Sequence, residues 1–129
     1  MIRTGNERTG NRLLNLPVKG GVILTEGTMA IINSDGFAEP ASPAADVLIA
    51  GCVQQYCDNR NGGNGVADAK VKRGTFVWEN DGSIEVTDIL KKCYIKNATT
   101  VTLTPDGSSV AGTILAVEDD GVTVDMTQV

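Results

Sequence analysis

The side chains best suited to covalent chemistry are three cysteines, Cys52, Cys57 and Cys93, in a sequence that contains no histidine. A serine or cysteine nucleophile needs a base beside it, and histidine is the commonest such base. A serine–lysine pair with Ser-x-x-Lys spacing does not occur either. The sequence therefore predicts no catalytic residues and a protein that is not an enzyme.

Metal binding by the cysteines is equally unsupported. Cys52 and Cys57 have four residues between them, whereas zinc and redox motifs place two. One further cysteine and no histidine cannot complete a four-ligand zinc site. An odd number of cysteines indicates reduced thiols in a protein made in the cytoplasm. We therefore expect no metal and no cofactor.

The segment 58–68 is rich in glycine and asparagine and opens with Asp58. It fails the EF-hand template, because Arg60 stands at the third position and Ala69 at the twelfth, where a glutamate is required. The plain interpretation is a long surface loop. Two alternatives stay open: an irregular calcium site using Asp58, Asn61 or Asp68, and a protein contact made by Arg60.

The overall charge excludes some classes of partner. The formal net charge is -5, with 16 acidic and 11 basic residues, and nucleic-acid binding depends mainly on lysine and arginine. No apolar run is long enough to span a bilayer. The N-terminus has no apolar stretch of the signal-peptide kind. We expect neither nucleic acid nor membrane as a partner, and no export through a cleaved signal.

Charge is unevenly placed along the chain. The first 20 residues are basic, whereas no lysine or arginine follows Lys96 and five acidic residues do. Opposite charge at two ends of a small protein favours head-to-tail contact between neighbours. Each aspartate taken singly has a simpler explanation, as a solvated turn residue.

Residue choice indicates β-structure. Val, Ile and Thr make up 36 of 129 residues, and these branched side chains suit pleated sheets. Turn signals recur about every ten residues, as in sandwiches and small barrels. We predict an all-β fold, a small β-sandwich or β-barrel, with an extended N-terminal arm and at most one short helix.

Several elements can be placed. Strands are expected over 22–24, 29–32, 47–53 and 71–78, with Glu26-Gly27 as the turn between the first two. Asn80-Asp81-Gly82 predicts a hairpin whose second strand holds Ile84 and Val86. A short helix is expected over 87–92. The last third predicts strands over 99–104, 110–117 and 122–126, with Asp119-Asp120-Gly121 as the final turn.

The chain divides into an N-terminal arm, residues 1–20, and a single β domain, residues 21–129. Glycines and asparagines interrupt any periodicity up to about residue 12, so a frayed terminus is one interpretation. The other is a contact arm, in which Arg3, Arg8 and Arg12 bind another protein. Trp78, the single tryptophan, is expected in the core or as an interface anchor.

Three stretches, taken in their order and spacing, resemble the small capsid cement, or head decoration, proteins of tailed bacteriophages. The first is Ile49–Val53 followed by Val71–Phe76. The second is Thr87–Ile89 followed by Cys93–Val101. The third is Ser109–Val117 followed by Asp120–Val124. The resemblance covers roughly residues 45 to 126. The Lys92-Cys93 pair and the arginine-bearing arm depart from the usual pattern.

The resemblance implies a virion structural protein that binds the outer face of the capsid and stabilises contacts between capsomers. Its partner would be the major capsid protein, and it would form a homo-oligomer, a trimer or dimer. It would be made in the host cytoplasm and reside on the capsid exterior. Under this interpretation Arg3, Arg8, Arg12, Arg60 and Trp78 are the protein-contact residues.

A competing class is a sugar- or receptor-binding β module of a phage fibre or surface adhesin. Such modules stack exposed aromatic rings on sugars, and the sequence offers Tyr56, Tyr94 and Trp78 for that purpose.

Overall fold

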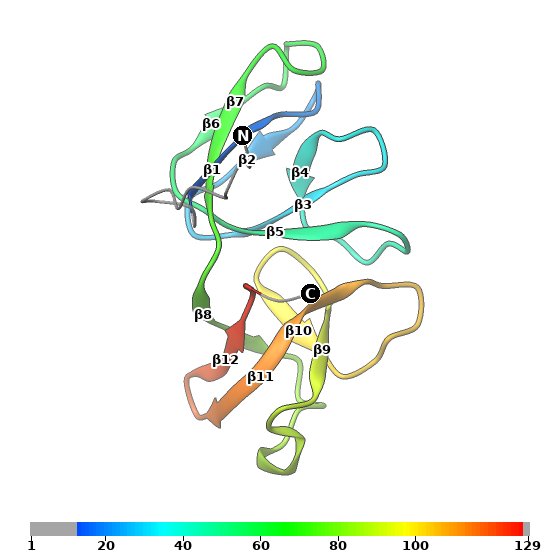
Figure 1. Ribbon diagram of the computed structural model, residues 1–129, viewed down its shortest axis with the longest axis vertical. Coiled ribbons are helices and arrows are strands. Elements are labelled where there is room, and N and C mark those ends of the chain that lie inside the picture. The colour runs from blue at the N-terminus through cyan, green and yellow to red at the C-terminus, as the bar shows by residue number, and fades with distance from the viewer. Residues whose placement is uncertain (1–12, 128–129) are drawn as a thin grey trace, which may run out of the picture.

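The computed structural model describes residues 13–127 as an elongated, two-lobed assembly of β-strands (Figure 1). The predicted all-β fold is confirmed. The upper lobe in Figure 1 contains β1 (Leu13–Pro17), β2 (Ile23–Leu24), β3 (Met29–Ile32), β4 (Ala38–Pro40), β5 (Leu48–Val53), β6 (Cys57–Asp58) and β7 (Asp68–Lys72). The lower lobe contains β8 (Thr75–Asn80), the 3₁₀ turn η1 (Val86–Asp88), β9 (Lys92–Ile95), β10 (Thr100–Thr102), β11 (Val110–Glu118) and β12 (Gly121–Asp125).

The upper lobe is an antiparallel sheet of order β1-β7-β5-β3-β4, with β2 and β6 forming a separate two-stranded pair. The strands expected over 22–24 and 29–32 are present, but β2 pairs with β6 and not with β3. An isolated parallel bridge joins Val18 to Ala38, so the chain after β1 approaches the far edge of the sheet.

The boundary of the N-terminal arm needs correction. Residues 13–17, which the sequence placed in the arm, form β1 and pair with β7, with Leu14 opposite Val71. The reason is hydrophobic packing, because Leu16 lies against the buried residues of the upper lobe. Arg3, Arg8 and Arg12 lie outside the described residues.

The lower lobe is a closed barrel of order β10-β8-β12-β11-β9. The predicted final hairpin is confirmed, since β11 and β12 pair antiparallel up to Glu118 and Gly121 around the turn at Asp119-Asp120. The hairpin predicted at Asn80-Asp81-Gly82 is wrong. The partners of β8 are β12 and β10, and residues 84–86 form no strand.

Asn80 explains why that turn does not lead into a hairpin. Its side-chain oxygen accepts hydrogen bonds from the N–H of Gly82 at 2.8 Å and of Ile84 at 3.3 Å, and its Nδ2 donates to the Ile84 carbonyl at 2.8 Å. Ile84 is buried. The backbone of Ile84 is thus bonded to a side chain and not to a neighbouring strand.

The helix predicted over 87–92 is reduced to the single 3₁₀ turn η1, and β9 already begins at Lys92. The N–H of Leu90 donates to the Ile114 carbonyl at 2.7 Å, and the N–H of Ile114 donates to the Lys91 carbonyl at 2.9 Å. These bonds to β11 replace the bonds that would continue a helix.

The strand predicted over 71–78 is divided between the two lobes. β7 ends at Lys72, β8 begins at Thr75, and Arg73-Gly74 forms the crossing. The Arg73 guanidinium donates to three carbonyls, of Ile49 in the upper lobe at 3.4 Å, and of Met126 and Thr127 after β12 at 3.1 and 3.4 Å. It therefore links both lobes.

The larger hydrophobic cluster spans the two lobes. It joins Met29, Ile31 and Ile49 from the upper sheet to Ile114 and Val124 from the barrel. A smaller cluster of short side chains lies within the upper lobe. Each large aliphatic side chain fully buried in this way contributes about 1.5–3 kcal/mol, so the two lobes are held together by a shared core.

Candidate contact surface

Trp78 is a core residue, which corrects its prediction as a contact residue. Its exposed fraction is 5%. The indole Nε1 lies 3.1 Å from the sulfur of Met126, and the ring centroid lies 6.1 Å from that of Phe76. The alternation along β8 is as predicted, because Val77 points outward with 52% of its surface exposed. The indole offers no surface to a partner.

The loop after β6 is anchored at its start by Asn59, which is 3% exposed. The Asn59 Nδ2 donates to the carbonyls of Val18, Lys19 and Gly63 at 3.2, 3.0 and 3.0 Å. This one side chain therefore holds the loop against the chain segment that follows β1.

Arg60, at the surface of the same loop, folds back onto Asp58. Its Nη2 lies 2.8 Å from Asp58 Oδ2, and its backbone N–H donates to Asp58 Oδ1 at 3.1 Å. That backbone bond, together with the guanidinium, lowers the pKa of Asp58. Arg60 is accessible, so its role in protein contact stays a prediction. The Asp58 carboxylate is already paired with the Arg60 guanidinium.

The three cysteines are all free thiols. Cys52 and Cys93 are buried and Cys57 is half-buried. Burial raises the pKa of Cys93 to about 12 and raises the pKa of Cys52 and Cys57 as well. Since the thiolate is the reactive form, these environments suppress nucleophilic chemistry.

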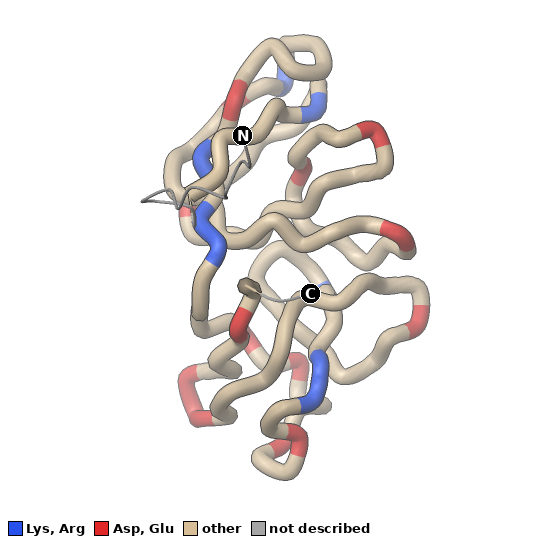
Figure 2. The backbone as a smooth tube through the Cα atoms, viewed as in Figure 1, with Lys and Arg blue, Asp and Glu red and all other residues tan. Residues whose placement is uncertain are grey.

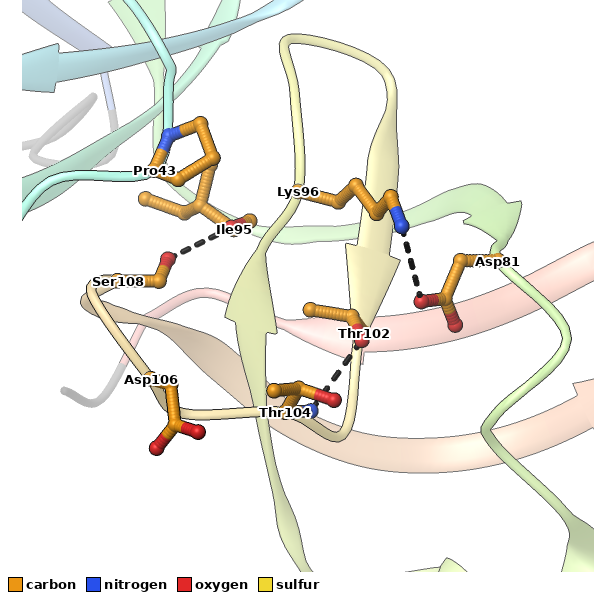
Figure 3. A pocket seen from close by; sticks show the side chains of 8 residues that line it. All are labelled: Pro43, Asp81, Ile95, Lys96, Thr102, Thr104, Asp106 and Ser108. Carbon is orange, nitrogen blue, oxygen red and sulfur yellow. Dashed lines mark hydrogen bonds and ion pairs between the residues drawn. The ribbon is translucent and has the colours of Figure 1, made fainter.

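A pocket of about 230 Å³ with a mixed polar and apolar lining opens beside β9 and β10 (Figure 3). Its walls include Lys96 and Asp81, whose charged groups lie 3.7 Å apart. Ser108 Oγ donates to the Ile95 carbonyl at 2.6 Å, and Thr102 Oγ1 accepts from the N–H of Thr104 at 3.2 Å. The polar groups of the lining are thus engaged in bonds within the lining itself.

Three apolar side chains stand exposed on and after η1. Val86, Ile89 and Leu90 have exposed fractions of 64%, 39% and 73%. We call these three residues the apolar tip. Leu90 has a φ of 74°, in the left-handed region that costs an L-residue other than glycine roughly 1–2 kcal/mol. The sequence concealed this feature, because residues 87–92 were predicted as a short helix.

Hydrogen bonds fix the backbone of the apolar tip. Asp88 Oδ2 accepts from the Glu85 N–H at 2.8 Å, and Asp88 Oδ1 lies 3.1 Å from Lys91 Nζ. The first of these bonds and then the lysine lower the pKa of Asp88. With the two bonds between residues 90–91 and Ile114 described above, they hold Leu90 outward in a strained conformation.

Acidic residues dominate the lower lobe. Residues 75–127 include nine aspartates and glutamates against three lysines, and red segments surround the lower half of Figure 2. A shallow groove of about 400 Å³ at the end of the barrel contains Glu79, Glu118, Asp119 and Asp120. The predicted acidic end of the molecule is thus the barrel.

Over residues 13–127 no group of three or more histidine, cysteine, aspartate or glutamate side chains could hold a metal ion. Within the same residues no helix is long and apolar enough to cross a membrane. No known family model, no curated protein and no solved structure matches this chain.

Proposed function

We propose that this chain is a capsid decoration protein of a tailed bacteriophage, which binds the outer surface of the shell and stabilises contacts between capsomers. The order and spacing of the three sequence stretches that resemble decoration proteins support this function. In this role it is no enzyme, it works by contact alone, and its partner is the major capsid protein.

The observation that carries the proposal is the apolar tip. Exposed apolar groups are common on protein surfaces when they occur singly. Here three occur within five residues, and the most exposed of them, Leu90, is held in a costly backbone conformation by bonds to β11. Strain maintained by the surrounding structure is concentrated at functional sites. The tip therefore contacts the capsid.

Modest contacts are sufficient for such a protein. Burying one of these side chains contributes about 1.5–3 kcal/mol, and many copies on one lattice, or linked copies, multiply the effect through avidity. The core and the Arg73 bonds shared by the two lobes supply the rigidity that a bridge between capsomers needs.

A sugar- or receptor-binding module is less well supported. Of the three aromatic residues available for stacking, Trp78 is buried, Tyr94 is half-buried and Tyr56 alone is largely exposed, at 59%. A single exposed ring is a poor platform for sugar recognition.

The test is co-sedimentation of the purified chain with shells assembled from the major capsid protein of the same phage. We expect saturable binding, and at least about a tenfold loss of affinity for Leu90→Asp, because a charge would have to be desolvated in an apolar contact. The matched control is Tyr56→Asp, which introduces the same charge at another exposed side chain and leaves binding unchanged. Absence of binding by the unmodified chain would exclude the proposal.

A further inference from the structure

A row of four outward-facing side chains, three of them apolar, crosses the outer surface of the barrel. Val77 on β8 is paired with Thr123 on β12, and Thr123 is paired with Ala116 on β11. Leu115 is the extra residue of a β-bulge between Ile114 and Ala116 and is 40% exposed. Val77, Thr123, Ala116 and Leu115 point away from the core, because their neighbours Trp78, Val122, Val124 and Ile114 are buried in it. We call these four residues the outer row.

An acidic row runs beside it, two residues further along β8 and β11. Glu79 follows Val77 on the outward side of β8, and Glu118 follows Ala116 on the outward side of β11. Glu118 is paired with Gly121, and a Cβ built on Gly121 would lie 3.0 Å from a methyl carbon of Val77. Asp119 and Asp120 extend this row into the turn. The surface therefore presents an apolar strip with carboxylates along one side.

We propose that this surface binds residues 1–12 of a second copy of the chain. Those residues begin Met1-Ile2 and carry three arginines, Arg3, Arg8 and Arg12, against the single acid Glu7. The apolar pair fits the outer row, and the arginines are complementary in charge to the acidic row.

The positions of the two elements favour binding of the segment to the barrel of another copy. Residues 1–12 lead into β1 in the upper lobe, whereas the outer row lies on the barrel in the lower lobe (Figure 1). Twelve extended residues span at most about 40 Å, enough to reach an adjacent molecule. The result is head-to-tail association of copies. This association is a property of the isolated chain. A failure to associate would therefore leave the proposed capsid binding untouched, and a failure to bind capsids would leave the proposed association untouched.

The test is sedimentation velocity on the full chain over a range of concentrations. We expect concentration-dependent association that weakens at least about tenfold when sodium chloride rises from about 0.05 to 0.5 M, because exposed charges are screened. The triple variant Arg3→Glu, Arg8→Glu, Arg12→Glu and the double variant Glu79→Lys, Glu118→Lys each abolish association. Mixing the two variants restores it.

The control is Glu26→Lys with Asp35→Lys, two exposed acids of the upper lobe, which leaves association unchanged. Circular dichroism checks that every variant is folded. A monomer at all concentrations would overturn the proposal, including the case in which the segment binds its own barrel. Association that survives both charge reversals, or fails to return on mixing, would overturn it as well.

Discussion

At the scale of single residues, Leu90 and Asp88 show how local bonding fixes an exposed feature. Leu90 has a left-handed backbone and a side chain 73% exposed, so neither its conformation nor its packing stabilises the isolated molecule. Asp88 accepts a backbone bond and pairs with Lys91. The two residues together place an apolar side chain in solvent at a cost that the proposed capsid contact would offset.

Leu90→Gly should therefore separate stability from binding. Glycine relieves a left-handed strain of roughly 1–2 kcal/mol and adds unfolded-state entropy costing about 0.5–1 kcal/mol. We expect the free energy of unfolding to rise by about 0.5 kcal/mol, measured by urea denaturation, while capsid affinity falls. Weaker folding together with unchanged affinity would show that Leu90 is a structural residue.

Asp88 gives the apolar tip a pH dependence. Its pKa in the folded chain is lowered, so its stabilising effect is present above the unfolded value near 3.8 and is lost as pH falls through the folded value. Asp88→Asn should be less stable than the unmodified chain at about pH 7, and the difference should shrink as the pH falls below the unfolded value and then through the folded value. Thermal unfolding at several pH values measures this. A difference independent of pH would mean that charge is not involved.

At the scale of elements, the sequence predicted those features that depend on near neighbours. The β11–β12 turn, the buried strand over residues 48–53 and the alternation of Val77 and Trp78 follow from local patterns. The partners of β8 could not be predicted, because β10 and β12 are distant in the sequence and join β8 only when the barrel closes.

The candidate site was harder to predict from the sequence than the fold. The burial of Trp78 depends on barrel closure, and the exposure of Leu90 depends on backbone bonds to Ile114, 24 positions away. The break at Arg73-Gly74 divides the single strand that the sequence predicts over 71–78. The sequence did identify Arg60 as accessible.

Arg73 is the side chain whose removal should most affect the junction of the two lobes. Arg73→Ala leaves the carbonyls of Ile49, Met126 and Thr127 without this donor, and losing bonds to a charged group costs about 1.5–3 kcal/mol. We expect destabilisation of about 2 kcal/mol by urea denaturation. The neighbouring control Lys72→Ala, at an exposed position, should change stability by less than about 0.5 kcal/mol. Equal losses of stability in Arg73→Ala and Lys72→Ala would show that the Arg73 bonds do not stabilise the junction.

At the scale of the whole molecule, the barrel combines two surfaces of different kind. The apolar tip lies on and after η1, and the outer row with its acidic border crosses β8, β12 and β11. A shell contact by the first and a neighbour contact by the second would together form a net over a capsid, in which each weak contact is reinforced by the others.

The most direct test is electron cryo-microscopy of shells reconstituted with and without the chain. We expect additional density on the outer capsid surface, with Val86, Ile89 and Leu90 against the major capsid protein and the upper lobe further from the shell. Identical reconstructions, or a bound chain whose apolar tip points into solvent, would contradict it.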